Sequence, residues 1–109
     1  ENMMYVAGEQ DLTYDPVTAA QAADSMLNMS GVDASFVITR RPEDLVGISA
    51  RSNGEVNVQR VMEELGGGGH LSSGATQIAD KTIEEVVAML IDAINEVKNE
   101  EAPEESEDN

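Results

Sequence analysis

The sequence contains no cysteine and a single histidine, His70. Without cysteine the chain can form no disulfide bond, no thiolate metal site and no cysteine nucleophile, and nothing in it indicates an oxidising compartment. A single histidine also leaves no histidine cluster for a transition metal. We therefore expect a chain from a reducing, cytoplasmic setting that has no metal site and no catalytic residue of its own.

Basic residues are scarce as well. Six lysines and arginines stand against 22 aspartates and glutamates, which gives a formal net charge of −16. A surface of this sign repels the phosphates of duplex nucleic acid and the headgroups of an anionic membrane, so we expect neither as a partner. The sequence also contains no apolar run near the roughly 20 residues that a membrane-spanning helix needs.

The length of 109 residues is enough for one domain with one modest core. Residues 100–109 are mostly acidic and contain Pro103 but almost no apolar side chain. Such a segment buries too little apolar surface to offset its chain entropy. We predict one folded domain over residues 1–99 and an acidic disordered tail over residues 100–109. Because the chain begins with Glu1 and not with an initiator methionine, we also expect it to be part of a longer protein.

The first of three predicted helices begins at Asp15 and Pro16. Aspartate is a favoured N-cap, and proline fits the first helical position because its missing N–H would have no partner there. The helix ends before Gly31, which supplies a left-handed stop. Helical spacing predicts that one stripe faces the core, made of Val17, Ala20, Ala23 and Leu27.

Two further helices follow the same logic. One spans about residues 57–65, with apolar residues at helical spacing, and ends at Gly66. The other begins with a capping box made by Thr82 and Glu85. Its apolar face is continuous over residues 83–97, so we expect this helix to close the core.

Between these helices lie four segments with strand character, residues 4–7, 34–39, 46–51 and 75–78. In the third segment Val46 and Ile48 alternate with Ser49 and Arg51, which puts Arg51 on the face away from the apolar side chains. Residues 40–44 indicate a hairpin turn that pairs the second and third strands antiparallel. The predicted fold class is α/β, a small mixed β-sheet packed by about three helices in the order β-α-β-β-α-β-α.

Four consecutive glycines at residues 66–69 precede His70. Each glycine costs about 0.5–1 kcal/mol relative to alanine in chain entropy, so four in a row need a reason. One interpretation is that bare backbone admits a ligand and forms an anion-binding nest, strengthened if residues 71–73 begin a helical turn. The other is a flexible connector between a helix and a strand. His70 is correspondingly either a surface residue or a donor to a phosphate or base. The residues alone leave these alternatives open.

Arginines gather in one part of the sequence. Four of the six basic residues lie between positions 40 and 60, namely Arg40, Arg41, Arg51 and Arg60. Arg51 ends a strand and is followed by Ser52, so its planar fork is placed to hold a phosphate. For Arg40, Arg41 and Arg60 we favour surface pairs with the abundant carboxylates.

These motifs together resemble a known family. The run at residues 47–58, followed by the glycines and His70 and then by residues 74–76, resembles the DHH-associated domain that follows the catalytic DHH domain in a family of phosphoesterases. The strand at residues 34–38 and the alanine-rich first helix are similar, more narrowly, to the GdpP-type cyclic di-AMP phosphodiesterases. The likeness covers about residues 14–97.

The resemblance implies an active site in two parts. In that family the DHH domain binds a pair of divalent ions, usually manganese, and activates the attacking water, while the associated domain closes over the substrate. Matched by position, the substrate-binding residues are Arg51 and Ser52 for a phosphate, Gly67, Gly68 and Gly69 for the nucleotide, His70 for phosphate or base, and Asn57 as support for the Arg51-Ser52 turn.

The function that the resemblance implies is substrate binding for the hydrolysis of cyclic di-AMP to linear pApA. No Asp-His-His sequence occurs in the chain, so we expect it to be inactive alone and to act with a DHH domain of the same parent chain. Parent proteins of the GdpP type are anchored in the cell membrane with their catalytic part in the cytoplasm. Two alternatives stay open: a non-catalytic dimerisation or regulatory module that forms a homodimer, and a domain of a DHH-family nuclease that acts on short oligonucleotides.

Overall fold

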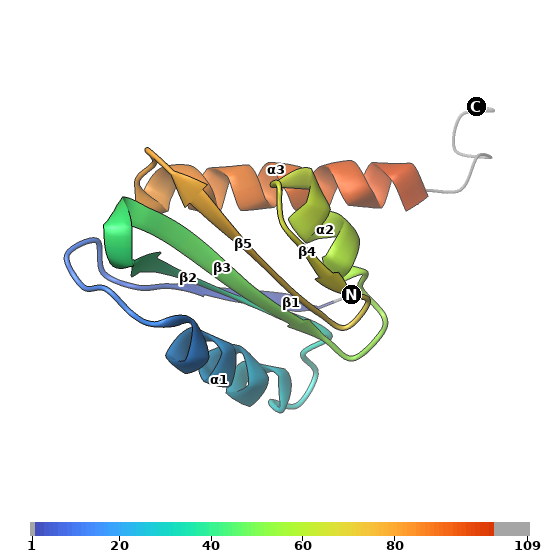
Figure 1. Cartoon of the computed structure of the whole chain (residues 1–109). Coiled ribbons are helices and arrows are strands. Elements are labelled where there is room, and N and C mark those ends of the chain that lie inside the picture. The colour runs from blue at the N-terminus through green and yellow to red at the C-terminus, as the bar shows by residue number, and fades with distance from the viewer. Residues whose placement is uncertain (1, 102–109) are drawn as a thin grey trace.

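Five strands form one mixed sheet in this computed structural model, which describes residues 2–101 (Figure 1). They are β1 (Met3–Ala7), β2 (Ala34–Arg41), β3 (Leu45–Ser52), β4 (Gly68–His70) and β5 (Ser73–Ala79). In space they follow the order β1-β2-β3-β5-β4. β1 runs parallel to β2, and the other neighbours pair antiparallel, which confirms the predicted hairpin of the second and third strands.

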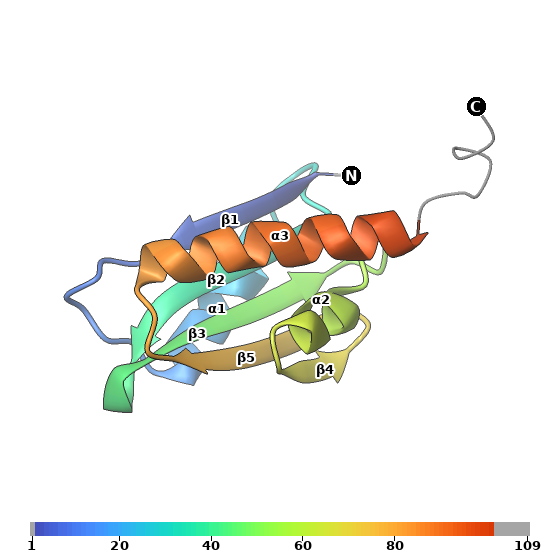
Figure 2. The ribbon, with the colours of Figure 1, turned by 90° about the horizontal axis from the view of Figure 1, so that it is seen from above.

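Three helices cover the two faces of this sheet. α1 (Pro16–Leu27) lies on one face against β2 and β3, whereas α2 (Val58–Glu64) and α3 (Ile83–Glu101) lie on the other (Figure 1, Figure 2). α2 packs on β4 and β5, at the edge of the sheet away from β1. The predicted class and element order are confirmed, and β4 is a short additional strand that the sequence did not predict.

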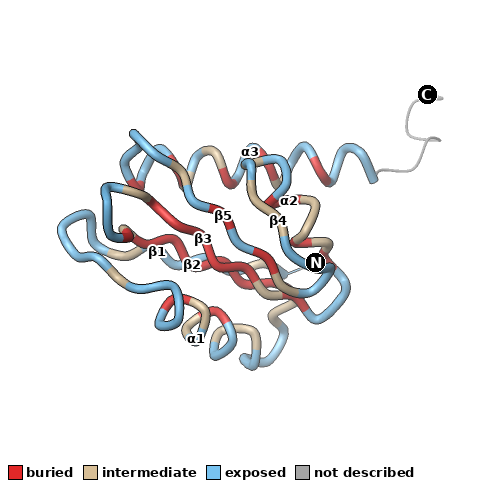
Figure 3. The backbone as a smooth tube through the Cα atoms, viewed as in Figure 1, coloured by how far each residue is buried: buried red, intermediate tan, exposed pale blue. Residues whose placement is uncertain are grey.

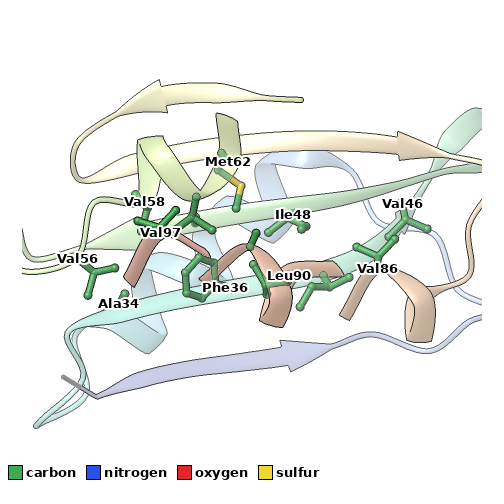
Figure 4. Close-up of a cluster of buried hydrophobic side chains, with 14 of the residues drawn as sticks. Ala34, Phe36, Val46, Ile48, Val56, Val58, Met62, Val86, Leu90 and Val97 are labelled. Atoms are coloured by element: carbon green, nitrogen blue, oxygen red, sulfur yellow. The ribbon is translucent and has the colours of Figure 1, made fainter. Parts of the chain in front are cut away.

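The main apolar core lies between the sheet and the two helices α2 and α3. Phe36, Val46 and Ile48 reach it from β2 and β3, and Leu90 meets them from α3 (Figure 4). Ile38 of β2 belongs to the same core. Burial is concentrated in these central strands, as Figure 3 shows. Because side chains alternate along a strand, the residues between these core positions point to the other face of the sheet, toward α1.

α1 packs on that second face through small residues. Ala19 and Ala23 are buried against Val37, and the Ser35 hydroxyl donates a hydrogen bond of 2.7 Å to the carbonyl oxygen of Ala23. The predicted stripe is confirmed at Ala23 but wrong at Val17, which is 64% exposed. Alanines occupy several neighbouring rows of this helix, so residue type alone does not identify the row that meets the sheet.

Hydrogen bonds confirm the predicted helix starts. Asp15 Oδ1 accepts a bond of 2.7 Å from the Thr18 N–H, and Thr82 and Glu85 exchange two bonds before α3. These contacts satisfy backbone N–H groups that have no partner within the helix. α3 continues to Glu101, past the predicted domain limit at residue 99. The rest of the predicted disordered tail lies outside the described residues, and that tail stays a prediction.

The turn between β2 and β3 is shorter than the predicted segment 40–44. It consists of the single 3-10 turn Pro42–Asp44, in which Glu43 and Asp44 have positive φ angles of 68° and 61°. Arg40 and Arg41 belong to β2, because their backbones continue the antiparallel ladder with β3. This extension brings Arg41 onto the face of the sheet that carries α1.

The core predicts a strong contrast between two neighbouring residues of α3. Leu90 is fully buried, whereas Ile91 is 43% exposed. We expect Leu90→Ala to lower the free energy of unfolding by about 2–5 kcal/mol, because it removes apolar contacts and leaves a cavity. Ile91→Ala, the matched control, should cost far less. Urea unfolding followed by circular dichroism measures both, and equal losses would contradict the assigned helix face.

A second prediction concerns acid. The Asn2 N–H and the Asn53 amide each donate a 3.0 Å hydrogen bond to Asp33. These bonds, the backbone one first, lower the pKa of Asp33 below its ordinary value. A carboxyl group with a lowered pKa in the fold stabilises it above the unfolded pKa, and this contribution disappears as the pH falls.

We therefore expect Asp33→Asn to lower the Tm at about pH 6, and the difference from the wild type to shrink toward about pH 3. Thermal melts across this range measure the difference. A difference that does not change with pH would show that the ionised carboxylate is not what these donors stabilise.

Candidate functional site

A cleft of about 530 Å³ opens beside α1, on the face of the sheet opposite the main core. Its walls come from elements far apart in the sequence. They are Pro16 and Ala20 of α1, Arg41 of β2, Ser49 and Arg51 of β3, Gly66 and Gly67 after α2, and residues 75–77 of β5. The volume lies in the range of small-ligand sites. Side chains alternate between the two faces of β3. Because Ile48 points into the core, Ser49 and Arg51 point to the opposite face and line the cleft.

Arg51 is held in the cleft by two hydrogen bonds. Its Nε donates to Asp24 Oδ1 of α1 at 2.8 Å, and its Nη1 donates to the carbonyl oxygen of Ala50 at 2.8 Å. Its Nη2 makes no hydrogen bond within residues 2–101, and 22% of the side chain is exposed. The guanidinium is thus oriented by the protein while one donor nitrogen stays available to a ligand.

The expectation that Arg41 pairs with a carboxylate at the surface is wrong. The residue is only 3% exposed, and none of the carboxylates within residues 2–101 lies within 4.0 Å of it. It hydrogen-bonds instead to the hydroxyls of Thr39 and Ser49, at 2.9 and 3.3 Å. Burial lowers the pKa of Arg41, and the charge of Asp15 opposes part of this shift. Arg40 and Arg60, by contrast, form the expected surface pairs.

The sequence carried a signal for Arg41. Ser35, Val37 and Thr39 alternate on the α1 face of β2, and Arg41 is the next member of that series. The interpretation of residues 40–44 as a turn ended the strand too early and hid this placement.

The glycine run is neither a flexible connector nor a nest before a helix. Residues 68–70 form β4, which pairs antiparallel with β5, and residues 71–72 make the turn between the two strands. No helical turn begins at residues 71–73, so the condition that would have strengthened an anion-binding nest is not met. Glycines have no side chain whose alternation reveals a strand, which is why the sequence pattern did not show β4.

Two of these glycines are required by close packing. A Cβ atom on Gly67 would lie 2.2 Å from the carbonyl oxygen of Ala75, and one on Gly69 would lie 2.3 Å from that of Ser73. Gly68 differs, since a Cβ there would meet nothing within 4 Å. It pairs with Ala75, which lines the cleft, so the surface of β4 at Gly68 continues the cleft as open backbone.

His70 is exposed at the end of β4. It pairs with Ser73, which in turn pairs with Arg51, so His70 and Arg51 lie in one row across three strands. Residues directly opposite in antiparallel strands point to the same face, and two strand spacings amount to about 10 Å. The structure therefore places His70 beside the cleft, on the side lined by Gly66 and Gly67. Together with Gly68 we call this side the glycine wall.

Ser52 and Asn57 shape the segment that follows Arg51. The buried Ser52 hydroxyl accepts hydrogen bonds from the N–H groups of Gly54 and Val56, at 2.9 and 3.3 Å. Asn57 is the N-cap of α2, with Oδ1 accepting a 3.0 Å bond from the Arg60 N–H. Both side chains are engaged within the protein, and direct contact of Ser52 with a phosphate stays a prediction.

This fold and the pairing of an arginine-lined cleft with a glycine strand define a domain class. The family model described as the DHHA1 domain matches residues 2–100, and the chain belongs to this family of DHH-associated domains. The resemblance stated from the sequence motifs is thereby confirmed.

Within that family the chain is most informatively compared with two longer proteins. It is 58% identical over 95 residues to the cyclic-di-AMP phosphodiesterase PdeA of Listeria monocytogenes, and 52% identical over 89 residues to the cyclic-di-AMP phosphodiesterase GdpP of Geobacillus thermodenitrificans. The matches cover 87% and 82% of this chain but only 14% of each relative. The narrower resemblance to the GdpP type is confirmed, for one domain of these proteins.

A solved structure shares the fold. An exopolyphosphatase-related protein of Bacteroides fragilis superposes with a TM-score of 0.69 at 24% sequence identity, covering 88% of this chain and 29% of that one. At this identity the likeness supports the fold alone.

The described residues offer no ligand set for a metal. Within residues 2–101, no three histidine, aspartate or glutamate side chains are grouped so that they could hold an ion. We therefore assign no step of any reaction to a metal bound by this part of the chain.

The glycine wall predicts opposite results for two similar substitutions. Gly67→Ala should lower the free energy of unfolding by about 1–3 kcal/mol, because its methyl group overlaps the backbone of β5. Gly68→Ala should change it by less than about 0.5 kcal/mol, because the space beside it is open. Urea unfolding measures both values. Similar values for the two variants would mean that the backbone near β4 is not arranged as described.

Proposed function

We propose that this domain binds the phosphate and nucleotide parts of cyclic di-AMP, or of its linear product pApA, and presents them for hydrolysis of a phosphodiester bond by a DHH domain of the same parent chain. The observation that carries the proposal is the cleft, in which Arg41 and Arg51 stand opposite open glycine backbone. The names of the two bacterial relatives, both cyclic-di-AMP phosphodiesterases, supply the ligand class.

Charge supports this cleft over the other hollows of the surface. Within the described residues 2–101, no aspartate or glutamate lines it, although the chain carries a net charge of −16. Of two other hollows, one is lined by Glu64, Asp92 and Glu96 and the other by Glu84. An anionic ligand is repelled by most of this protein, so a cleft lined by two guanidinium groups, of which Asp24 pairs with one, is the more favourable place for it.

Each residue then has a distinct part in binding. The Nη2 of Arg51 donates to a phosphate oxygen, while the nucleotide lies against the backbone of Gly67, Gly68 and Gly69. His70, at the far end of the same row, donates to a phosphate or a base. Ser52 and Asn57 hold the segment after Arg51 in shape, and Ser52 reaches a phosphate only if that segment rearranges.

The chemical step belongs to the parent protein in this proposal. Divalent ions, manganese by the resemblance, are held by the DHH domain and activate the water that attacks phosphorus. Within the part of the chain that the structure describes, no helix has the length and apolar content needed to cross a membrane. We place the domain on the cytoplasmic side of a membrane-anchored parent, where a cyclic dinucleotide signal would reach it.

A second candidate function is an interaction module, because the free edge of the sheet is apolar. Met4, Tyr5 and Val6 of the edge strand β1 are 37%, 49% and 49% exposed. An edge strand with apolar side chains is a pairing surface for another chain. A homodimer through β1 would leave the cleft at the other side of the sheet accessible. Dimerisation and ligand binding can therefore be tested independently.

Titration of the chain with cyclic di-AMP and with pApA tests the proposed function. We expect binding by calorimetry, with amide NMR shifts at Arg51 and residues 67–70. Arg51→Ala should weaken binding about tenfold or more, because it removes a charged hydrogen bond to phosphate. Arg60→Ala is the matched control, since it removes the same charge at the α2–α3 surface, where Arg60 pairs with Glu64 and Glu100.

Equal affinity of the wild type and Arg51→Ala would contradict the proposed site. Light scattering across protein concentration, with and without nucleotide, covers the second candidate. The interaction module would be favoured by a dimer whose dissociation constant does not change with nucleotide, together with unchanged NMR signals at residues 67–70. Tighter binding of a short single-stranded oligonucleotide than of either dinucleotide would favour the nuclease alternative.

A further inference from the structure

Arg41 is an exception among the arginines of this chain. Arg40, Arg51 and Arg60 each form an ion pair with a carboxylate, at distances of 2.7–3.2 Å. Arg41 is more buried than any of these and forms no such pair with a residue of the described part of the chain. Burying a charge without an adjacent opposite charge costs folding free energy. A buried arginine without an ion pair is therefore a candidate for a functional role.

The guanidinium of Arg41 is fixed in place without being neutralised. Its Nε and Nη2 donate to the hydroxyls of Thr39 and Ser49, which are uncharged, and its Nη1 has no hydrogen-bond partner within residues 2–101. Gly47 makes the room for it, since a Cβ there would lie 2.3 Å from Arg41 Cζ and 2.6 Å from Nη1. The structure thus holds a positive charge rigidly at the wall of the cleft.

The nearby carboxylate of Asp15 offsets only part of the effect of burial on Arg41 and forms no ion pair with it. It lies beyond 4.0 Å from Arg41, and its Oδ1 accepts a hydrogen bond from the Thr18 N–H at the start of α1. Asp15 is exposed and is used in capping. Among residues 2–101, no aspartate or glutamate lines the cleft itself beside Arg41.

Arg41 and Arg51 both line the cleft, on the neighbouring strands β2 and β3. Ser49, which Arg41 Nη2 contacts at 3.3 Å, lies two residues before Arg51 on β3. Two residues of a strand span about 7 Å. The two guanidiniums are held by separate partners, Thr39 and Ser49 for Arg41 and Asp24 and Ala50 for Arg51, so each can offer its own free donor nitrogen to an anion.

We propose that Arg41 is a second anion-binding residue of the cleft, and that the cleft selects ligands with two separate phosphate groups over ligands with one. This inference rests on the proposed function, in which Arg51 and the glycine backbone hold the first phosphate and its nucleotide. Arg41 then receives the second phosphate through Nη1. A dinucleotide with two phosphates fills both positions, whereas a mononucleotide fills one.

The test compares pApA with AMP on the chain and its variants. Arg41→Gln should weaken pApA binding about tenfold, because a charged hydrogen bond is lost, and should leave AMP binding within about twofold. Arg40→Gln is the matched control, since it removes the same charge from the adjacent residue, whose side chain faces the opposite side of β2. It should leave the affinity for both ligands unchanged.

A measurement on the wild type covers the case in which Arg41→Gln does not fold. The side-chain Nε–Hε NMR signal of Arg41 should shift on addition of pApA and on addition of inorganic pyrophosphate, but little with AMP. An unmoved Arg41 signal with pApA bound, or an equal loss of pApA and AMP affinity in Arg41→Gln, would overturn the inference.

The two proposals fail in different ways. If pApA binds, shifts residues 67–70 and depends on Arg51 but not on Arg41, the proposed function stands and the second anion position is wrong. If pyrophosphate shifts the Arg41 signal but neither dinucleotide binds, the anion position stands and the proposed dinucleotide function is wrong.

Discussion

The alternation of side chains along β3 is the constraint on which the rest of this structure depends. Val46 and Ile48 turn to one face and complete the core beneath α2 and α3, while Ser49 and Arg51 turn to the other and line the cleft. A shift of one residue in the pairing with β2 or β5 would bury Arg51 in the core and expose Ile48. Register, core packing and the position of the candidate site are therefore one property, set by the apolar residues of a single strand.

The glycine wall depends on a second set of contacts. α2 carries the chain to β4, and its place is set by Val58, Val61 and Met62 in the core and by the bridge from Arg60 to Glu100 of α3. Gly67 then passes so close to β5 that only a residue without a side chain fits. The open backbone at Gly68 is thus positioned by a helix on the opposite face of the sheet, which gives a rigid support to a strand of three residues.

Most of the fold could be predicted because its signals lie in side-chain pattern: the capping residues of α1 and α3, the apolar face of α3 and the alternation of β2 and β3. The same pattern located Arg51. Arg41 was missed because the strand was ended two residues early, at a turn rich in charged residues. β4 was missed because glycines carry no pattern, and the contact row of α1 because several rows offer alanine. The end of β2, the strand β4 and the buried row of α1 are determined by strand pairing and burial in three dimensions. Local sequence patterns do not reveal these.

The ion pair between Arg51 and Asp24 has a consequence for selectivity. In a chain with 22 acidic residues, a guanidinium without a partner would attract carboxylates of the protein itself. Asp24 acts as a built-in competitor that already occupies Nε at 2.8 Å. A free carboxylate gains little by displacing one of its own kind, whereas in the proposed function a phosphate would also contact the glycine backbone, which Asp24 does not reach. The ion pair thereby orients Arg51 and reduces the attraction of its guanidinium for further carboxylates.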